Sequence, residues 1–189
     1  SQQIQDETTK PEIKVDPGTL TRIGTVSIEF RGEITQASEK YQKRIEQIRA
    51  AWPLKADSPF RSSEWEQAKS TLLSTVTQEE FAAAAIVTSQ ATVDPDHARA
   101  DLSITIDSGP IFYFGDIQIT GLTRYDQTLI TNLAPFKAGD AYRRDLLHSY
   151  QIALQKAPQF STVSVSISPD IAQHQSIPVQ VVLTEAQSQ

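Results

Sequence analysis

Residues 135–143 read PFKAGDAYR, and residues 53–61, which lie 82 positions earlier, read PLKADSPFR. The matched pairs are Pro53 and Pro135, Lys55 and Lys137, Ala56 and Ala138, Phe60 and Tyr142, and Arg61 and Arg143. Segments rich in Pro, Gly and Asp are typical of turns between regular elements. The repetition of this turn predicts that the chain contains two copies of one structural unit.

A second repeated segment lies where each copy begins. Residues 16–25 read DPGTLTRIGT and residues 107–116 read DSGPIFYFGD, 91 positions apart. We expect each Asp-x-Gly to end the final strand of one domain and the following residues to begin the first strand of the next. Because the separation falls from 91 to 82, the first copy has nine more residues around its first helix. Without a flexible linker, the domains should be held at a restricted angle.

The second copy predicts the element order β-α-α-β-β. Apolar and polar residues alternate in the three expected strands, at 114–121, 161–167 and 177–183. A first helical stripe follows Thr123 and Asp126, which resemble a capping arrangement. A second helix has Asp140 as its expected N-cap, and its apolar residues recur at fourfold spacing: Tyr142, Leu146, Tyr150 and Leu154. The Gly139 backbone is expected to have a positive φ in the turn between the helices.

The first copy follows the same order. Its strands are expected at 24–30, 83–93 and 99–106, and its helices near 39–52 and after a capping box at Ser63 and Glu66. Residues 12–18 align with 103–109 and predict the last strand of a preceding unit. The predicted domains are therefore 1–17 (tail), 18–108 and 109–189. The fold class is α+β.

Composition excludes several functions. The 189 residues hold 17 basic and 23 acidic side chains, a formal net charge of −6, and no basic block for nucleic-acid binding appears. There is no Cys for a disulfide or a thiolate site. There is also no Met, so we expect a processed or excised piece of a longer protein. The most apolar uncharged run, 81–93, is too short to span a bilayer.

No catalytic, cofactor-binding or metal-binding site is predicted. His97, His148 and His174 lie in different expected elements, and the turn at 94–97 explains the two acidic residues beside His97. The carboxylates of Glu64, Glu66, Glu79 and Glu80 fall at helix ends, where capping or solvation is the expected role. Trp52 and Trp65 lie on apolar helix stripes and are expected in the core.

The tandem β-α-α-β-β unit resembles the polypeptide-transport-associated (POTRA) domain. The residues that carry the resemblance are 107–115, 160–165 and the turn motif Pro135, Phe136, Lys137, Gly139, Asp140 and Tyr142. The resemblance implies two domains, each with a three-stranded mixed sheet packed against two antiparallel helices. The resemblance covers about 15–189. Among outer-membrane β-barrel assembly factors, the chain resembles the TamA type most. By that analogy, these are the second and third of three such domains.

This resemblance implies a function in the periplasm of a Gram-negative bacterium, as part of an outer-membrane protein. The implied partners are unfolded outer-membrane or autotransporter polypeptides, an envelope-spanning TamB-like protein and the chain's own C-terminal β-barrel. No nucleic acid and no cofactor are implied, and this piece is expected to be a monomer. Chaperone-like delivery of polypeptides requires no catalytic residue.

Open sheet edges offer a physical route to such binding, because an extended substrate can add as a strand. In the POTRA fold the strand after the second helix lies at an edge, which corresponds to 83–93 and 161–168. Val163, Val165 and Ile167 are expected to face the helices, and Ser164→Pro is expected to remove one main-chain donor from the edge. The expected docking strand comprises Ser161, Thr162, Val163, Ser164, Val165, Ser166, Ile167 and Ser168.

Two alternatives remain open from the residues. In the first alternative, the chain is the POTRA pair of a two-partner-secretion transporter or of the general barrel-assembly protein. A small αβ enzyme or RNA-binding module would require a convergent polar pocket or a basic face, and the sequence shows neither.

Overall fold

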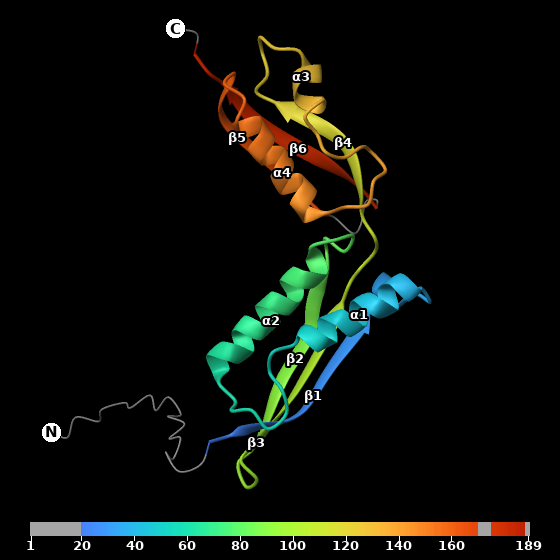
Figure 1. Ribbon diagram of the computed structural model, residues 1–189, viewed down its shortest axis with the longest axis vertical. Coiled ribbons are helices and arrows are strands. Elements are labelled where there is room, and N and C mark those ends of the chain that lie inside the picture. Colours follow the sequence, from blue (N-terminus) through green and yellow to red (C-terminus); the bar gives the residue numbers. More distant parts are fainter. Residues whose placement is uncertain (1–19, 170–174, 188–189) are drawn as a thin grey trace, which may run out of the picture.

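A computed structural model describes residues 20–169 and 175–187 (Figure 1). The first domain comprises β1 (Arg22–Arg31), a 3₁₀ turn η1 (Glu33–Thr35), α1 (Glu39–Ala51), α2 (Ser62–Thr77), β2 (Ala85–Asp94) and β3 (Arg99–Asp107). The second comprises β4 (Tyr113–Thr120), α3 (Gln127–Thr131), α4 (Arg144–Gln155), β5 (Phe160–Ile167) and β6 (Ser176–Glu185). The predicted order β-α-α-β-β is therefore confirmed in both copies. The predicted strand at 12–18 lies outside the described residues.

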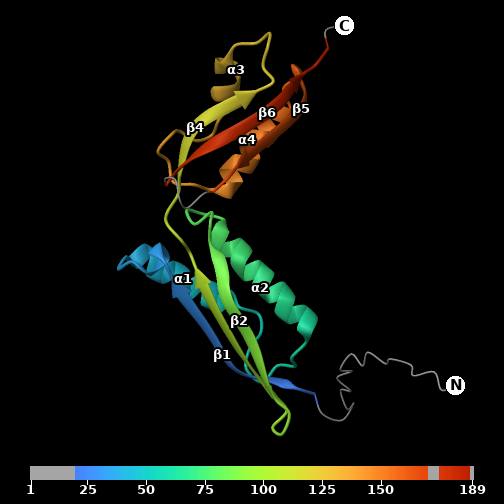
Figure 2. The same ribbon diagram turned by 180° about the vertical axis from the view of Figure 1, so that it is seen from behind.

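Each domain has its own three-stranded mixed sheet. The strand orders are β1-β3-β2 and β4-β6-β5. In each sheet the last strand is central, parallel to the first strand and antiparallel to the strand before it. In the first domain the helices cover one face of the sheet, as the views from the two sides show (Figures 1 and 2). The predicted α+β fold class is confirmed.

Two separate hydrophobic cores hold the helices to the sheets. The first contains Trp52 and Trp65, whose rings meet edge to face with centroids 6.1 Å apart. Both side chains are buried, as predicted. The second is built around Phe136, which stacks on Phe114 at 3.9 Å and meets Tyr150 edge to face. Aromatic pairs of this kind add to the stabilisation from burial.

A β-bulge explains the repeated Gly that opens the first strand of each domain. The register shifts between Phe114 and Ile117, so that Gly115 and Asp116 lie opposite Pro178 alone. The same shift between Ile23 and Val26 involves Gly24. A Cβ on Gly115 would lie 2.9 Å from the carbonyl oxygen of Ile177, which is too close for any side chain. Glycine is therefore required because the neighbouring backbone approaches so closely.

The repeated turn docks on the first strand of its own domain in the same way in both copies. The Gly139 N–H donates to the Phe114 carbonyl at 2.8 Å, and the Asp57 N–H donates to the Ile23 carbonyl at 2.8 Å. Gly139 has a φ of +93°, as predicted, and Asp57 has a φ of +67°. Asp is one of the few residues with a side chain that tolerate this region. The two sequence segments that lie 82 positions apart thus form the same turn, which is hydrogen-bonded through its main chain to the first strand of its domain.

Three predicted helix caps are wrong. The N-cap of α4 is Arg143, and the Asp140 carboxylate instead accepts a hydrogen bond from the Lys137 N–H at 2.9 Å. The N-cap of α2 is Arg61, so Ser63 and Glu66 lie inside the helix and form no capping box. The Asp126 carboxylate caps α3, without Thr123. The reason for α4 is tertiary: Ala141 and Arg143 form antiparallel bridges to Tyr113 and Glu79, which keeps this segment extended.

Candidate functional site

The predicted docking strand lies at a sheet edge, because within the described residues β5 pairs with β6 alone. Its side chains alternate as predicted: Val163 and Val165 are buried and Ile167 is half-buried in the second core, whereas the remaining residues are exposed. The exposed side chains carry no charge; they are Ser161, Thr162, Ser164, Ser166 and, just beyond the strand, Ser168. The edge therefore lacks the charged side chains that usually prevent strand addition.

The strand ends at Ile167, as predicted, and a proline in the central strand leaves Ser168 of the predicted docking edge outside it. The register pairs Ile167 with Val179, so Ser168 would lie opposite Pro178. Proline has no N–H to donate to a neighbouring strand. Ser168 therefore lies outside β5, which ends at Ile167.

One main-chain donor of this edge is already occupied. The Val165 N–H donates to the side-chain carbonyl oxygen of Gln151 on α4 at 3.0 Å. In antiparallel pairs, successive residues point their main-chain groups alternately toward the partner strand and away from it. Because the Val165 N–H points away from β6, the main-chain groups of Val163 also face outward, and those of Ser164 face β6. The predicted effect of Ser164→Pro is therefore wrong, since this change would remove a bond inside the sheet.

The other predicted edge strand, β2, lies at the edge of the first sheet. It begins at Ala85, two residues later than predicted, because residues 82–83 form a turn. It pairs with β3 with a bulge at Val87, and Val87 and Val93 are about half exposed. A bulge bends an edge strand locally and interrupts regular pairing. β5 has one such shift as well, between Phe160 and Thr162, so each edge strand is interrupted once and β2 is the longer of the two.

The predicted turn motif lies at the base of the second domain. Phe136 and Tyr142 are buried in the core, whereas Pro135, Lys137, Gly139 and Asp140 are exposed. The main chain at Tyr142 forms part of the junction with the first domain. The Tyr142 carbonyl accepts a hydrogen bond from the Glu80 N–H at 2.7 Å. The motif therefore shapes both its own core and the contact between domains.

The junction is a backbone-bonded contact made by the loop after α2. Besides the bond to Tyr142, the Glu80 carbonyl accepts from the Phe112 N–H at 2.7 Å, and the Gln78 carbonyl accepts from the Arg144 N–H at 2.8 Å. Ala82 and Ala83 pack against the core of the second domain. The two domains are therefore joined by these hydrogen bonds and apolar contacts as well as by the peptide chain.

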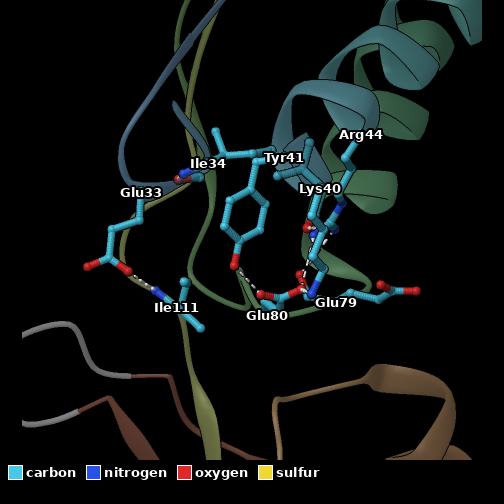
Figure 3. A network of polar contacts seen from close by, with 10 residues as sticks. Glu33, Ile34, Lys40, Tyr41, Arg44, Glu79, Glu80 and Ile111 are labelled. Atoms are coloured by element: carbon cyan, nitrogen blue, oxygen red, sulfur yellow. Dashed lines mark hydrogen bonds and ion pairs between the residues drawn. The ribbon is translucent and has the colours of Figure 1, made fainter. Parts of the chain in front are cut away.

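The side chain of Glu80 anchors this loop to α1 (Figure 3). Glu80 is 4% exposed and has a φ of +62°. Its carboxylate accepts hydrogen bonds from the Lys40 ammonium at 2.7 Å and from the Tyr41 hydroxyl, and the Arg44 guanidinium lies 4.0 Å away. A buried carboxylate is stable only when it is paired and hydrogen-bonded in this way.

The surroundings of Glu80 shift the pKa values of both groups. Burial acts to raise the pKa of Glu80, but the hydrogen bonds from Lys40 and Tyr41 outweigh it and hold that pKa below its ordinary value. Burial, together with the bond to Glu80, raises the pKa of Tyr41. The carboxylate is therefore ionised and the phenol is protonated at neutral pH, which preserves the bonds between them.

A second carboxylate holds the connecting segment. Glu33 in η1 accepts a hydrogen bond from the Ile111 N–H at 2.6 Å, and its own N–H donates to the Gly109 carbonyl at 3.3 Å (Figure 3). The buried Ser108 hydroxyl accepts from the Ile34 N–H at 3.1 Å. The Asp-x-Gly at 107–109 is thus bonded to the first domain just before the chain enters the second.

Glu80 is the residue that the sequence interpretation placed incorrectly. It was expected to cap a helix or to be solvated, but it is buried. The other three carboxylates of that prediction are exposed: Glu64, Glu66 and Glu79. The signal in the sequence was its position directly before Phe81, which lies in the core at the start of the link to β2.

The other titratable groups are distributed over the surface. His97 is exposed and its Nδ1 lies 2.6 Å from the Asp94 carboxylate within the predicted turn. His148 is exposed on α4, and His174 lies outside the described residues. Within residues 20–169 and 175–187, no group of three or more His, Cys, Asp or Glu side chains is placed to hold a metal ion. In the same residues, no helix has the length and apolar character needed to cross a membrane.

A polar network also closes the far end of the second domain. The Glu185 carboxylate accepts hydrogen bonds from the Arg124 side chain at 2.7 Å and from the main-chain N–H groups of Thr123 and Arg124. The bond from Arg124 is the largest influence that lowers the pKa of Glu185, which falls to about 2. This network fixes the segment after β4 to the end of the central strand.

Comparison with known proteins agrees with this architecture. Residues 112–186 match the family model described as "POTRA: Surface antigen variable number repeat". No curated protein sequence matches the chain.

Several solved structures have a similar fold. POTRA3-5 of Haemophilus influenzae BamA is 16% identical with a TM-score of 0.64, over 87% of this chain and 61% of that one. BamA from Haemophilus ducreyi lacking POTRA domains 1-3 is 13% identical with a TM-score of 0.66, over 87% of this chain and 29% of that one. POTRA1-2 of Anabaena Omp85 is 13% identical with a TM-score of 0.55, over 90% of this chain and 100% of that one.

The chain thus spans less than two thirds of the two BamA structures. At these identities the likeness concerns the fold. The described chain has the fold of two tandem POTRA domains, and the second of them matches the POTRA family model itself.

Proposed function

We propose that this chain is the periplasmic POTRA region of a Gram-negative outer-membrane assembly protein, and that it receives unfolded outer-membrane or autotransporter polypeptides. The observation that carries the proposal is the edge strand β5, which is uncharged and unpaired on its outer side. The match of its domain to the POTRA family supports it. The role is one of binding and delivery and involves no catalysis.

Strand addition is the proposed mode of binding. An extended client pairs with the outward main-chain groups of β5, with Val163 at the centre, and main-chain hydrogen bonds supply the affinity. The client must also displace Gln151 from the Val165 N–H. We therefore expect weak binding, with specificity for an alternating apolar and polar pattern rather than for one sequence.

The finer assignment is to the TamA type. In this proposal, an envelope-spanning TamB-like protein docks on the POTRA region, and the chain leads into its own C-terminal β-barrel. Translation of the gene beyond Gln189 tests this assignment. Recurrent segments of about ten residues with alternating hydrophobicity are expected there, as in membrane barrels.

The strand-addition experiment uses Val163→Pro, which removes one outward donor and leaves the bonds of Ser164 to β6 intact. The probe is a labelled peptide of about ten residues that alternates Val with Ser and Thr, the pattern of a barrel strand. Fluorescence anisotropy is expected to show weaker binding by Val163→Pro, with the wild-type circular dichroism spectrum retained. A folded variant that binds the peptide as wild type does would refute docking at β5.

A further inference from the structure

The hydrogen bonds at the start of the first domain repeat those at the start of the second. We call 20–22 and 53–62 the first base, and 111–113 and 135–144 the second base. The Phe60 N–H donates to the Thr21 carbonyl at 2.8 Å, and the equivalent Tyr142 N–H donates to the Phe112 carbonyl at 2.9 Å. The isolated bridges correspond in the same way: Arg22 with Pro59, and Tyr113 with Ala141. The two bases therefore present their main-chain groups in the same arrangement.

Three main-chain groups of the second base hold the loop after α2. They are the Phe112 N–H, the Tyr142 carbonyl and the Arg144 N–H, which bond to Glu80 and Gln78. The offsets of 91 and 82 residues assign their equivalents in the first base: the Thr21 N–H, the Phe60 carbonyl and the Ser62 N–H. Within residues 20–169 and 175–187, none of these three equivalents has a hydrogen-bond partner. The first base thus carries a free copy of the groups that form the junction.

An exposed apolar side chain marks the same surface. Ile111, just before β4, packs against the core of the first domain. Its equivalent 91 positions earlier is Leu20, which is 57% exposed and is the most exposed large apolar side chain among the described residues. Phe60 is also only half-buried, whereas its equivalent Tyr142 is buried. The first base therefore lacks the cover that the second base receives from the domain before it.

We propose that the first base docks the loop after the second helix of a further POTRA domain, which precedes residue 12 in the same polypeptide. The docking surface consists of Leu20, Thr21, Phe60 and Ser62, at the end of the first domain that is opposite the second (Figure 1). Residues 12–18 align with 103–109, the segment that leads into the junction, so the chain itself brings such a domain to this surface. The contact depends on the POTRA fold and not on client binding at β5.

A second copy of this chain does not supply the required loop. In each copy, the loop after α2 is already bonded to its own second domain through Glu80. In the loop after α4, the Gln159 carbonyl already accepts a hydrogen bond from the Ala186 N–H at 2.8 Å. The partner that fits is therefore a domain on the N-terminal side, joined by the same main-chain bonds that Glu80 and Gln78 make at the junction.

Hydrogen exchange at four amides tests the proposal in two chains. One is the protein of 189 residues, and the other is the same protein lengthened by the sequence that its gene encodes upstream of Ser1. The Phe112 and Arg144 amides are internal references, because they are bonded across the junction in both chains. The Thr21 and Ser62 amides should exchange freely in the shorter chain and at least about tenfold more slowly in the longer one.

Two variants of the longer chain test the polar and the apolar contacts separately. Ser62→Pro removes one donor, and the free domain tolerates it because Ser62 is the first residue of α2, where proline is favoured. Leu20→Asp removes the apolar contact from an exposed position. Each variant should speed exchange at Thr21 about tenfold.

Leu133→Asp is the matched control for Leu20→Asp, because Leu133 is an exposed leucine of the second domain. It should leave exchange at Thr21 unaltered. Thermal unfolding of the 189-residue protein checks folding, and neither Ser62→Pro nor Leu20→Asp should change its midpoint, since both positions are exposed there.

Three results would overturn the proposal. They are protection of Thr21 and Ser62 already present in the 189-residue chain, unaltered exchange in the longer chain, and wild-type exchange at Thr21 in both folded variants. The first result would show that the chain's own N-terminal residues cover the first base. No client peptide is used in these measurements, so they do not bear on strand addition. Conversely, unaltered peptide binding by Val163→Pro would reject strand addition and leave this docking surface standing.

Discussion

Gln151→Ala tests strand addition by strengthening it. In the wild-type protein the Gln151 side chain occupies the Val165 N–H at 3.0 Å, so a client strand must displace it before it can use this donor. The net contribution of such a hydrogen bond is about 0.5–1.5 kcal/mol. Removing the competing side chain should therefore lower the client dissociation constant about 2- to 12-fold. The same change should reduce the stability of the free protein by about 0.5–1.5 kcal/mol.

Two measurements check this prediction. Fluorescence anisotropy with the barrel-strand peptide gives the affinity, and hydrogen exchange reports on the Val165 amide. This amide should lose protection in free Gln151→Ala and regain it when the peptide is added. Gln155→Ala is the matched control, because Gln155 is an exposed residue of the same helix. It should leave the affinity unaltered.

An affinity that stays the same or falls in folded Gln151→Ala would refute the reasoning. In that case either the client does not use the outward groups of β5, or Gln151 contributes to the bound state. Exchange at Val165 separates these explanations, since only the first leaves the amide unprotected when peptide is present.

Further predictions concern the junction and the turn. Glu80→Gln should broaden the distance distribution between spin labels placed on exposed positions of α1 and α4, while Glu79→Gln should not; an unaltered distribution in Glu80→Gln would count against the anchor. Since the pKa of Glu80 lies below 4.5, its ionised form stabilises the protein above that value, and this stability is lost as the pH falls through the lowered pKa. Wild-type unfolding should accordingly be more sensitive than that of Glu80→Gln to acidification from about pH 5 downward. Gly139→Val should lower stability by about 1 kcal/mol or more in chemical denaturation, because φ is +93° there; an unchanged midpoint would contradict this. Residues 110–189 expressed alone should unfold cooperatively on heating, as a separate core implies, and a broad, non-cooperative transition would argue against an independent domain.

The element order could be predicted because its signals are local. Alternating apolar residues mark the strands other than β2, fourfold spacing marks α4, and Pro and Gly mark the ends of elements. The repeat then placed the same turn in both halves, and the positive φ of Gly139 followed from its residue type. The buried faces of β5 and the core positions of Trp52 and Trp65 follow from the same periodicity.

The details of the candidate sites depended on contacts between segments far apart in the chain. Glu80 is buried because Lys40 and Tyr41, about 40 positions earlier, reach its carboxylate. No periodicity in the sequence indicates such a pairing. The donor of Val165 is occupied because α4 places Gln151 beside the edge, and this placement depends on how the helix packs on the sheet.

The sequence by itself determined that the chain contains two β-α-α-β-β units, because apolar spacing and turn residues act over a few positions. Only the tertiary structure decided which main-chain groups of β5 face outward and which carboxylate anchors the junction. The physical reason is that strand register and helix packing are set by the whole core. A shift of one residue in register exchanges the two faces of a strand, although the sequence is unchanged.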